Sequence, residues 1–178
     1  EVGCRVGLAS GASQLRRGFH PSGTTGTFAA AAAAAKMLRL EANHTLHALG
    51  IAGTQGAGLM AAQVSSMVKR MHPGRAAQSG VYGALLAAKG FTGIVDILEV
   101  PYGGFCTTLC DEGRTERITQ GLGEEFASLN VGFKLYPCCA NNHTSLDALE
   151  KIRTAHPSFR AQDVERVAVR TTRSSTLH

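Results

Sequence analysis

Histidine and lysine side chains are the groups of this sequence best able to move protons or hold anions, and His20 stands in a distinctive setting among them. It lies between Phe19 and Pro21, and proline disfavours helix at the residue before it. His20 should therefore project from an ordered loop just before an alanine-rich helix, where a histidine can meet an anion. A surface or helix-capping histidine is the alternative that the residues alone allow.

The segment VKRMHPG supplies two more basic groups. Lys69 and His72 are three residues apart, close enough to share a face if the segment forms one helical turn, whereas Arg70 would point elsewhere. An exposed basic patch is the alternative, and a core histidine bonded to a backbone carbonyl would explain His72 equally well. Lys134 stands in the alternating run VGFKLYP, where a lysine at a strand end reaches a cleft or simply points outward.

The spacing of cysteines and glycines does not support a metal or phosphate site. Cys106-x-x-x-Cys110 could begin a zinc site, but no second ligand pair follows at zinc spacing, so free thiols and a reducing compartment are expected. Adjacent Cys138 and Cys139 are awkwardly placed for a bridge to each other. GTTGT lacks the Lys-Ser/Thr ending of a P-loop. We predict no bound metal and no cofactor.

Alanine- and glycine-lined helices must position these residues. The alanine run predicts a helix over 27–40, and Pro73 and Gly90 delimit a second over 74–89. Between them, Leu46, Leu49 and Gly53 fall on one helical face. Small residues on these faces let helix axes approach closely, which predicts an all-helical domain over 1–128.

The pattern changes after Gly90. A turn-rich stretch precedes a short helix over 115–120, and a second unit begins near Leu129. There the sequence alternates over 131–136 and 164–171, which predicts strands, and has helical periodicity between them. The fold class is therefore mainly α, with the start of a smaller α/β domain over 129–178.

Composition indicates a soluble globular protein. Of 178 residues, 44% are hydrophobic and 17% charged, and the longest apolar run, 28–35, is far shorter than the roughly 20 residues that cross a bilayer. The net charge of +5 gives a mild preference for acidic small molecules, and neither nucleic acid nor membrane is an expected partner. The start EVGCRVGLASG reads as the middle of a longer chain.

Four segments together resemble the MmgE/PrpD family of metal-free lyases, which includes 2-methylcitrate dehydratases and cis-aconitate decarboxylases. They are RGFHPSGTTGTFAAAAAAAKML at 17–38, HALGIAGTQGAGLM at 47–60, VKRMHPGRAAQSGVYGALLAAKGFTG at 68–93 and FKLYPCCANNHTSLDA at 133–148. The resemblance covers most of the sequence but only the middle of a typical family member. It implies a large helical domain with an inserted α/β lid, and a substrate between them.

The family's reactions remove water or carbon dioxide next to a carboxylate, so the site needs cations or hydrogen-bond donors and a positioned acid or base. The resemblance implies catalytic roles for His20, Lys69 and Lys134, converging on one pocket at the domain junction. It implies substrate contacts from His72 and Cys139. The expected substrate is a di- or tricarboxylate, the expected assembly a homodimer, and the expected compartment the cytoplasm, or the mitochondrial matrix in a eukaryote.

Two departures bear on the reaction. Decarboxylases of the family resemble each other in having a histidine where this sequence has Cys139, and relatives often carry Arg and His at Ala140 and Asn141. Because PrpD-like dehydratases commonly read Y-P-C-C there, the departure at Cys139 favours a hydro-lyase that dehydrates a branched hydroxy-tricarboxylate such as 2-methylcitrate. The second departure puts the identity of the substrate in doubt. A cis-aconitate-type decarboxylase, an epimerase, and an inactive helical packing or dimerisation unit are the alternatives.

Overall fold

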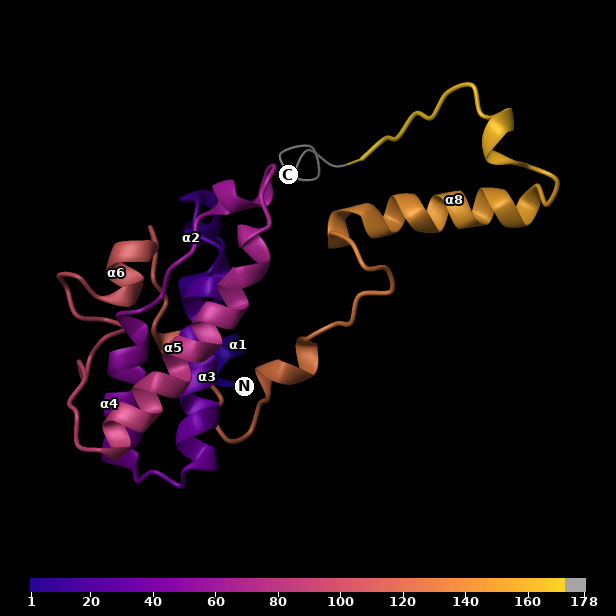
Figure 1. Cartoon of the computed structure of the whole chain (residues 1–178). Coiled ribbons are helices and arrows are strands. Elements are labelled where there is room, and N and C mark those ends of the chain that lie inside the picture. The colour runs from indigo at the N-terminus through magenta and orange to yellow at the C-terminus, as the bar shows by residue number, and fades with distance from the viewer. Residues whose placement is uncertain (172–178) are drawn as a thin grey trace. The chain divides into compact units, whose positions relative to one another are not determined.

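The computed structural model describes residues 1–171, which form helices and no β-strand (Figure 1). The chain divides into two compact units, Glu1–Asn130 and the residues from Val131 onward. The mainly helical fold class expected from the sequence is confirmed. Within the described range, no helix is long and apolar enough to span a membrane.

The first unit is built from seven α-helices and three short 3-10 helices. The α-helices are α1 (Val2–Ser10), α2 (Ser13–Arg16), α3 (Pro21–Met37), α4 (Ala42–Gly53), α5 (Met71–Ala88), α6 (Phe105–Leu109) and α7 (Glu116–Thr119). The 3-10 helices are η1 (Met60–Gln63), η2 (Val68–Arg70) and η3 (Ala127–Asn130). Helix α3 is central, since it packs against α1, α4 and α5.

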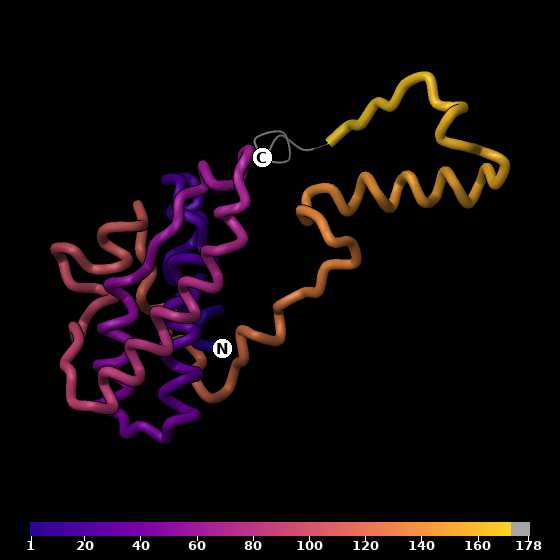
Figure 2. Tube along the Cα trace, viewed as in Figure 1, coloured from indigo at the N-terminus to yellow at the C-terminus, as the bar shows by residue number. Residues whose placement is uncertain are grey.

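Helices α3 and α5 lie side by side, as the tube trace shows (Figure 2). Gly80 of α5 sits directly against Ala30 and the backbone of Thr27 and Ala31 on α3, so closely that any side chain there would collide with them. Farther along, Ala35, Ala48, Ala84 and Ala87 form a buried cluster between α3, α4 and α5. The small residues of the sequence therefore bring these helix axes close together, as their pattern predicts.

Both long predicted helices begin earlier than expected. Helix α3 starts at Pro21 rather than Thr27, because proline suits the first helical position and the hydroxyls of Thr24 and Thr25 bond back to the Pro21 carbonyl. Helix α5 starts at Met71, which places Pro73 in the first turn, where its missing N–H costs no helical hydrogen bond. The early starts place His20 and His72 at helix N-termini.

The larger apolar side chains form a separate core between α1, α3 and α6. Phe28 is fully buried and meets Phe105 edge to face, with ring centroids 4.9 Å apart. Cys106 and Cys110 are free, buried thiols of this core. Burial raises the pKa of Cys106 to about 12, so this thiol stays protonated and packs as a small apolar group.

Arg5 of α1 ties the last part of the first unit to its first helix. Arg5 is 5% exposed, and its guanidinium pairs with the Glu1 carboxylate at 2.6 Å. The same group donates hydrogen bonds to four backbone carbonyls around α7, those of Ile118, Gln120, Gly121 and Glu125. These bonds offset the cost of burying the charge.

The second unit contains η4 (Ala140–Asn142), α8 (His143–Ala155) and η5 (Ala161–Asp163), and α8 buries no residue. The predicted strands at 131–136 and 164–171 are wrong, since both segments are irregular. Alternation predicts which faces of an extended segment differ, but a strand also needs a neighbour to bond its backbone. No such ladder forms within residues 1–171, where the one β-bridge joins Phe19 and Leu59 of the first unit.

Candidate active site

His20 is the N-cap residue of α3 and has an extended backbone, as proline after it requires. Its carbonyl accepts the N–H groups of Gly23 and Thr24, which closes the first turn of the helix. Its own N–H donates to the Gly58 carbonyl at 3.0 Å. The side chain makes no capping hydrogen bond, so the capping alternative is excluded and the imidazole is free for another partner.

That partner is His72, in the first turn of α5. The Nδ1 atoms of the two rings are 2.9 Å apart, and the ring centroids are 5.1 Å apart with the planes tilted by 52°. One Nδ1 donates the hydrogen bond and the other accepts it. His72 is 8% exposed and His20 is partly exposed. His72 therefore bonds another imidazole, not the backbone carbonyl that was one alternative.

Two glycines make room for His72. A methyl group on Gly58 would lie 2.9 Å from Nδ1 of the ring, and one on Gly23 would collide with the Ala57 carbonyl and approach Cβ of His72. The segment carrying Gly58 is held by its pairing with 18–20, which includes the hydrogen bond from Met60 N–H to the Gly18 carbonyl. Backbone on two sides thus limits where the imidazole can move.

Lys69 completes a basic cluster in the first unit. It lies on η2, and its Nζ donates to Oε1 of Gln63 at 3.2 Å. Burial of the ring, followed by the charges of His72 and Lys69, lowers the pKa of His20 from its ordinary value of 6.5. The structure thus brings His20 and His72 into contact, with Lys69 near enough for its charge to act on His20. This cluster favours an anion as its counterpart.

A buried polar chain supports the first turn of α3. The Thr24 hydroxyl donates to Oε1 of Gln14 at 2.6 Å, and Nε2 of Gln14 donates to the Ser10 hydroxyl at 2.6 Å. All three side chains are almost fully buried. The sequence analysis missed these buried hydrogen bonds, because neither residue type nor periodicity indicates that Gln14 pairs with Thr24.

Lys134 and Cys139 lie in the second unit. The Lys134 side chain is exposed and donates to the Cys138 carbonyl at 3.0 Å. Cys139 is an exposed free thiol just before η4. Each of these residues is described within its own unit, and the convergence of Lys134 with His20 and Lys69 stays a prediction.

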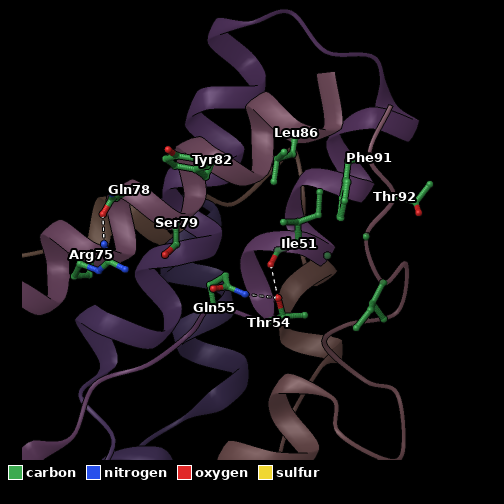
Figure 3. Close-up of a pocket in the computed structure, with 13 residues that line it drawn as sticks. Ile51, Thr54, Gln55, Arg75, Gln78, Ser79, Tyr82, Leu86, Phe91 and Thr92 are labelled. Atoms are coloured by element: carbon green, nitrogen blue, oxygen red, sulfur yellow. Dashed lines mark hydrogen bonds between the residues drawn. The ribbon is translucent and has the colours of Figure 1, made fainter. Parts of the chain in front are cut away.

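A separate groove of about 760 Å³ opens between α4, α5 and residues 91–94 (Figure 3). Its polar groups include Arg75, whose guanidinium bonds to Gln78, and Thr54, whose hydroxyl donates to the Ile51 carbonyl. The residues that line it include no histidine, lysine, aspartate or glutamate. The groove thus lacks a group that exchanges protons near neutral pH, and the histidine cluster is the stronger candidate for chemistry.

In residues 1–171, no three or more His, Cys, Asp or Glu side chains gather as metal ligands would. The imidazole pair is accompanied by Lys69, a cation that repels metal ions. The cluster can supply two things: positive charge for a carboxylate and an imidazole N–H for proton transfer.

Comparison with known proteins identifies the family of this chain. Residues 1–117 match the MmgE/PrpD N-terminal domain. The chain is 44% identical over 170 residues to a cis-aconitate decarboxylase-like protein of Aspergillus oryzae, covering 92% of the chain and 35% of that protein. Cis-aconitate decarboxylase of Aspergillus terreus is 38% identical over 166 residues (89% and 34%). The human enzyme of that name is 30% identical over 151 residues (82% and 30%).

These relatives correct one expectation from the sequence. Two of them are named cis-aconitate decarboxylases, hence carboxy-lyases, and the third is named decarboxylase-like, so the assignment as a hydro-lyase is wrong. A single departure, Cys139, weighed too heavily in that assignment, whereas identity along most of the chain points the other way. The chain spans about a third of the length of these curated relatives. It belongs to the MmgE/PrpD family.

Proposed function

We propose that this chain carries the histidine–lysine cluster of a decarboxylase acting on an unsaturated tricarboxylate of the cis-aconitate type. The observation that carries the proposal is its identity to decarboxylases over about nine-tenths of its length, a range that includes His20, Lys69 and His72. The cluster supports it, because it combines a cation with an imidazole of lowered pKa.

Decarboxylation makes two demands on such a site. The bond between carbon and a carboxylate breaks, carbon dioxide leaves, and the electron pair remains on carbon and spreads toward a neighbouring carboxylate. Lys69 stabilises negative charge on the substrate's carboxylates, since a fixed cation is worth more in a site that excludes water. His20 returns a proton to carbon, for which a weakly held imidazolium proton is suited.

The second unit has a part in the proposal. Lys134 would add a further cation for a trianionic substrate, and Cys139 would contact the substrate, if this unit covers the histidine cluster as a lid. A homodimeric assembly is likewise a proposal. Epimerisation and an inactive packing role receive no support comparable to the identity with decarboxylases.

The test is to incubate the intact protein with cis-aconitate and measure carbon dioxide together with the C5 unsaturated dicarboxylate. We expect both products in equal amounts, and their loss in His20→Asn. His44→Asn, an exposed histidine of α4, is the control and should keep full activity. Absence of carbon dioxide, or release of water from 2-methylcitrate instead, would contradict the proposed function.

A further inference from the structure

The contact between His20 and His72 restricts how many protons the two rings can hold. Their Nδ1 atoms lie 2.9 Å apart, a hydrogen-bond distance that requires one proton between them. Two imidazolium rings would place two protons in that space. The pair therefore accepts one additional proton while the contact is intact, and behaves as one acid.

The same contact determines which nitrogen of His20 reacts. In the singly charged pair, one proton lies between the Nδ1 atoms and both Nε2 atoms carry a proton. When His20 gives up its Nε2 proton, its Nδ1–H remains and donates to Nδ1 of His72. His72 must then carry its own proton on Nε2, since a neutral imidazole has one donor and one acceptor.

We propose that His72 is a positioning residue: its Nδ1 accepts the His20 Nδ1–H and so leaves Nε2 of His20 as the atom that exchanges a proton with the substrate. This role rests on the proposed function, and it replaces the substrate contact expected of His72. It agrees with the burial of His72 and with the backbone of Gly23 and Gly58 against it, which leave this ring less room to meet a substrate than the partly exposed His20.

The proton balance of the step follows. Carbon dioxide leaves with cleavage of its bond to carbon, the Nε2 proton of His20 forms the new carbon–hydrogen bond, and His20 becomes neutral with Nδ1–H retained. Solvent then returns one proton to Nε2. Burial of the ring is the largest cause of the lowered pKa of His20, followed by His72 on α5, which competes for the single additional proton, and the charge of Lys69 on η2. Burial and the Lys69 charge make the proton easier to donate.

The direct test reads the tautomer by NMR. In the intact protein labelled with ¹⁵N-histidine, two-bond ¹H–¹⁵N correlations distinguish a protonated from an unprotonated ring nitrogen, and His20→Gln assigns the signals. Neutral His20 is expected to carry its proton on Nδ1, although free imidazole side chains favour Nε2–H. A neutral His20 protonated on Nε2 in the unsubstituted protein would overturn the proposal, whether or not any variant folds.

Two substitutions separate positioning from simple packing. In His72→Asn, the amide oxygen lies near the former Nδ1 and still accepts the hydrogen bond, whereas His72→Leu removes the acceptor. We expect His72→Asn to keep the Nδ1–H tautomer and turnover within about tenfold of the parent. His72→Leu should shift His20 to Nε2–H, lower kcat on the order of 10²-fold and displace the pH profile of kcat/KM.

His47→Asn is the matched control, because His47 is also partly buried and bonded, but to the backbone of Gly93. It should leave the tautomer of His20 and the pH profile unchanged. Equal losses in His72→Asn and His72→Leu with an unmoved pH profile would show that His72 only fills space. Failure to decarboxylate cis-aconitate would defeat the proposed function alone, since the tautomer is measured without substrate.

Discussion

Gly58 lies against the ring of His72 so closely that a methyl group at Gly58 would come within 2.9 Å of Nδ1 and 3.1 Å of Cγ. The backbone of Gly58 has φ +131°, a conformation that residues with a side chain rarely adopt. Glycine is therefore required here for two independent reasons. The position of the His20–His72 pair therefore depends on a residue that has no side chain.

Gly58→Ala should destabilise the protein and displace His72 from His20. Backbone strain together with the collision predicts a loss of about 1–3 kcal/mol in the free energy of unfolding, measured by denaturant titration. Turnover of cis-aconitate should fall as well. Gly74→Ala is the control, since a Cβ added to Gly74 of α5 would meet no neighbouring atom within 4 Å, and alanine there should be neutral or stabilising. Equal stability of the two variants would contradict this account.

Lys134→Ala tests whether the second unit contributes to the site. If Lys134 reaches the substrate beside Lys69, its loss should lower kcat on the order of 10²-fold with little change in the unfolding temperature. Lys151→Ala removes another exposed lysine of the same unit, on α8, and should have almost no effect. If Lys134→Ala behaves like Lys151→Ala, the predicted convergence of His20, Lys69 and Lys134 is wrong.

Acid should destabilise the first unit through His20. The pKa of His20 lies below 6.5 in the folded state. As the pH falls past 6.5, His20 is therefore protonated in the unfolded chain while it is still neutral in the folded protein. The free energy of unfolding therefore decreases as the pH falls from 6.5 to the lowered pKa, and this contribution levels off below it. Denaturant titrations across this range should show a shallower dependence in His20→Asn. If the free energy of unfolding depends on pH identically in His20→Asn and in the parent protein, the acid destabilisation does not come from His20.

Chelation should leave the activity intact. The proposed chemistry uses lysine and histidine to stabilise charge and transfer the proton, and the spacing of the cysteines and histidines predicts no metal ligands. Overnight dialysis against EDTA should therefore leave kcat unchanged. Loss of activity on dialysis, with recovery on adding zinc or iron, would show that the activity depends on a metal and would contradict this prediction.

The helices could be predicted from the sequence because their signals are local. The alanine run and the positions of Pro73 and Gly90 indicate where α3 and α5 lie. Their exact starts were missed, because Pro21 and Pro73 each lie inside the first turn of a helix and do not mark a boundary before it. The strand predictions were wrong because alternation is a local signal, whereas a strand forms only when its backbone pairs with a partner elsewhere in the chain.

The site was predictable only in its residue types. His20 and His72 are 52 residues apart, and no periodicity connects them. Their hydrogen bond arises because α3 and α5 both begin beside the Gly58 segment, which is a consequence of helix packing. The resemblance to a family indicated that both matter. It could not show that the imidazoles of His20 and His72 are hydrogen-bonded to each other.

The Arg5 guanidinium has a consequence for how the chain is made. It binds carbonyls as distant as that of Glu125, 120 residues later in the sequence. At a synthesis rate of roughly 5–20 residues per second, those carbonyls emerge from the ribosome about 6–24 s after Arg5 does. During that interval the Arg5 guanidinium lacks its final carbonyl acceptors. The first unit therefore completes its fold late in its own synthesis, and a chaperone has seconds in which to bind it before it is fully folded.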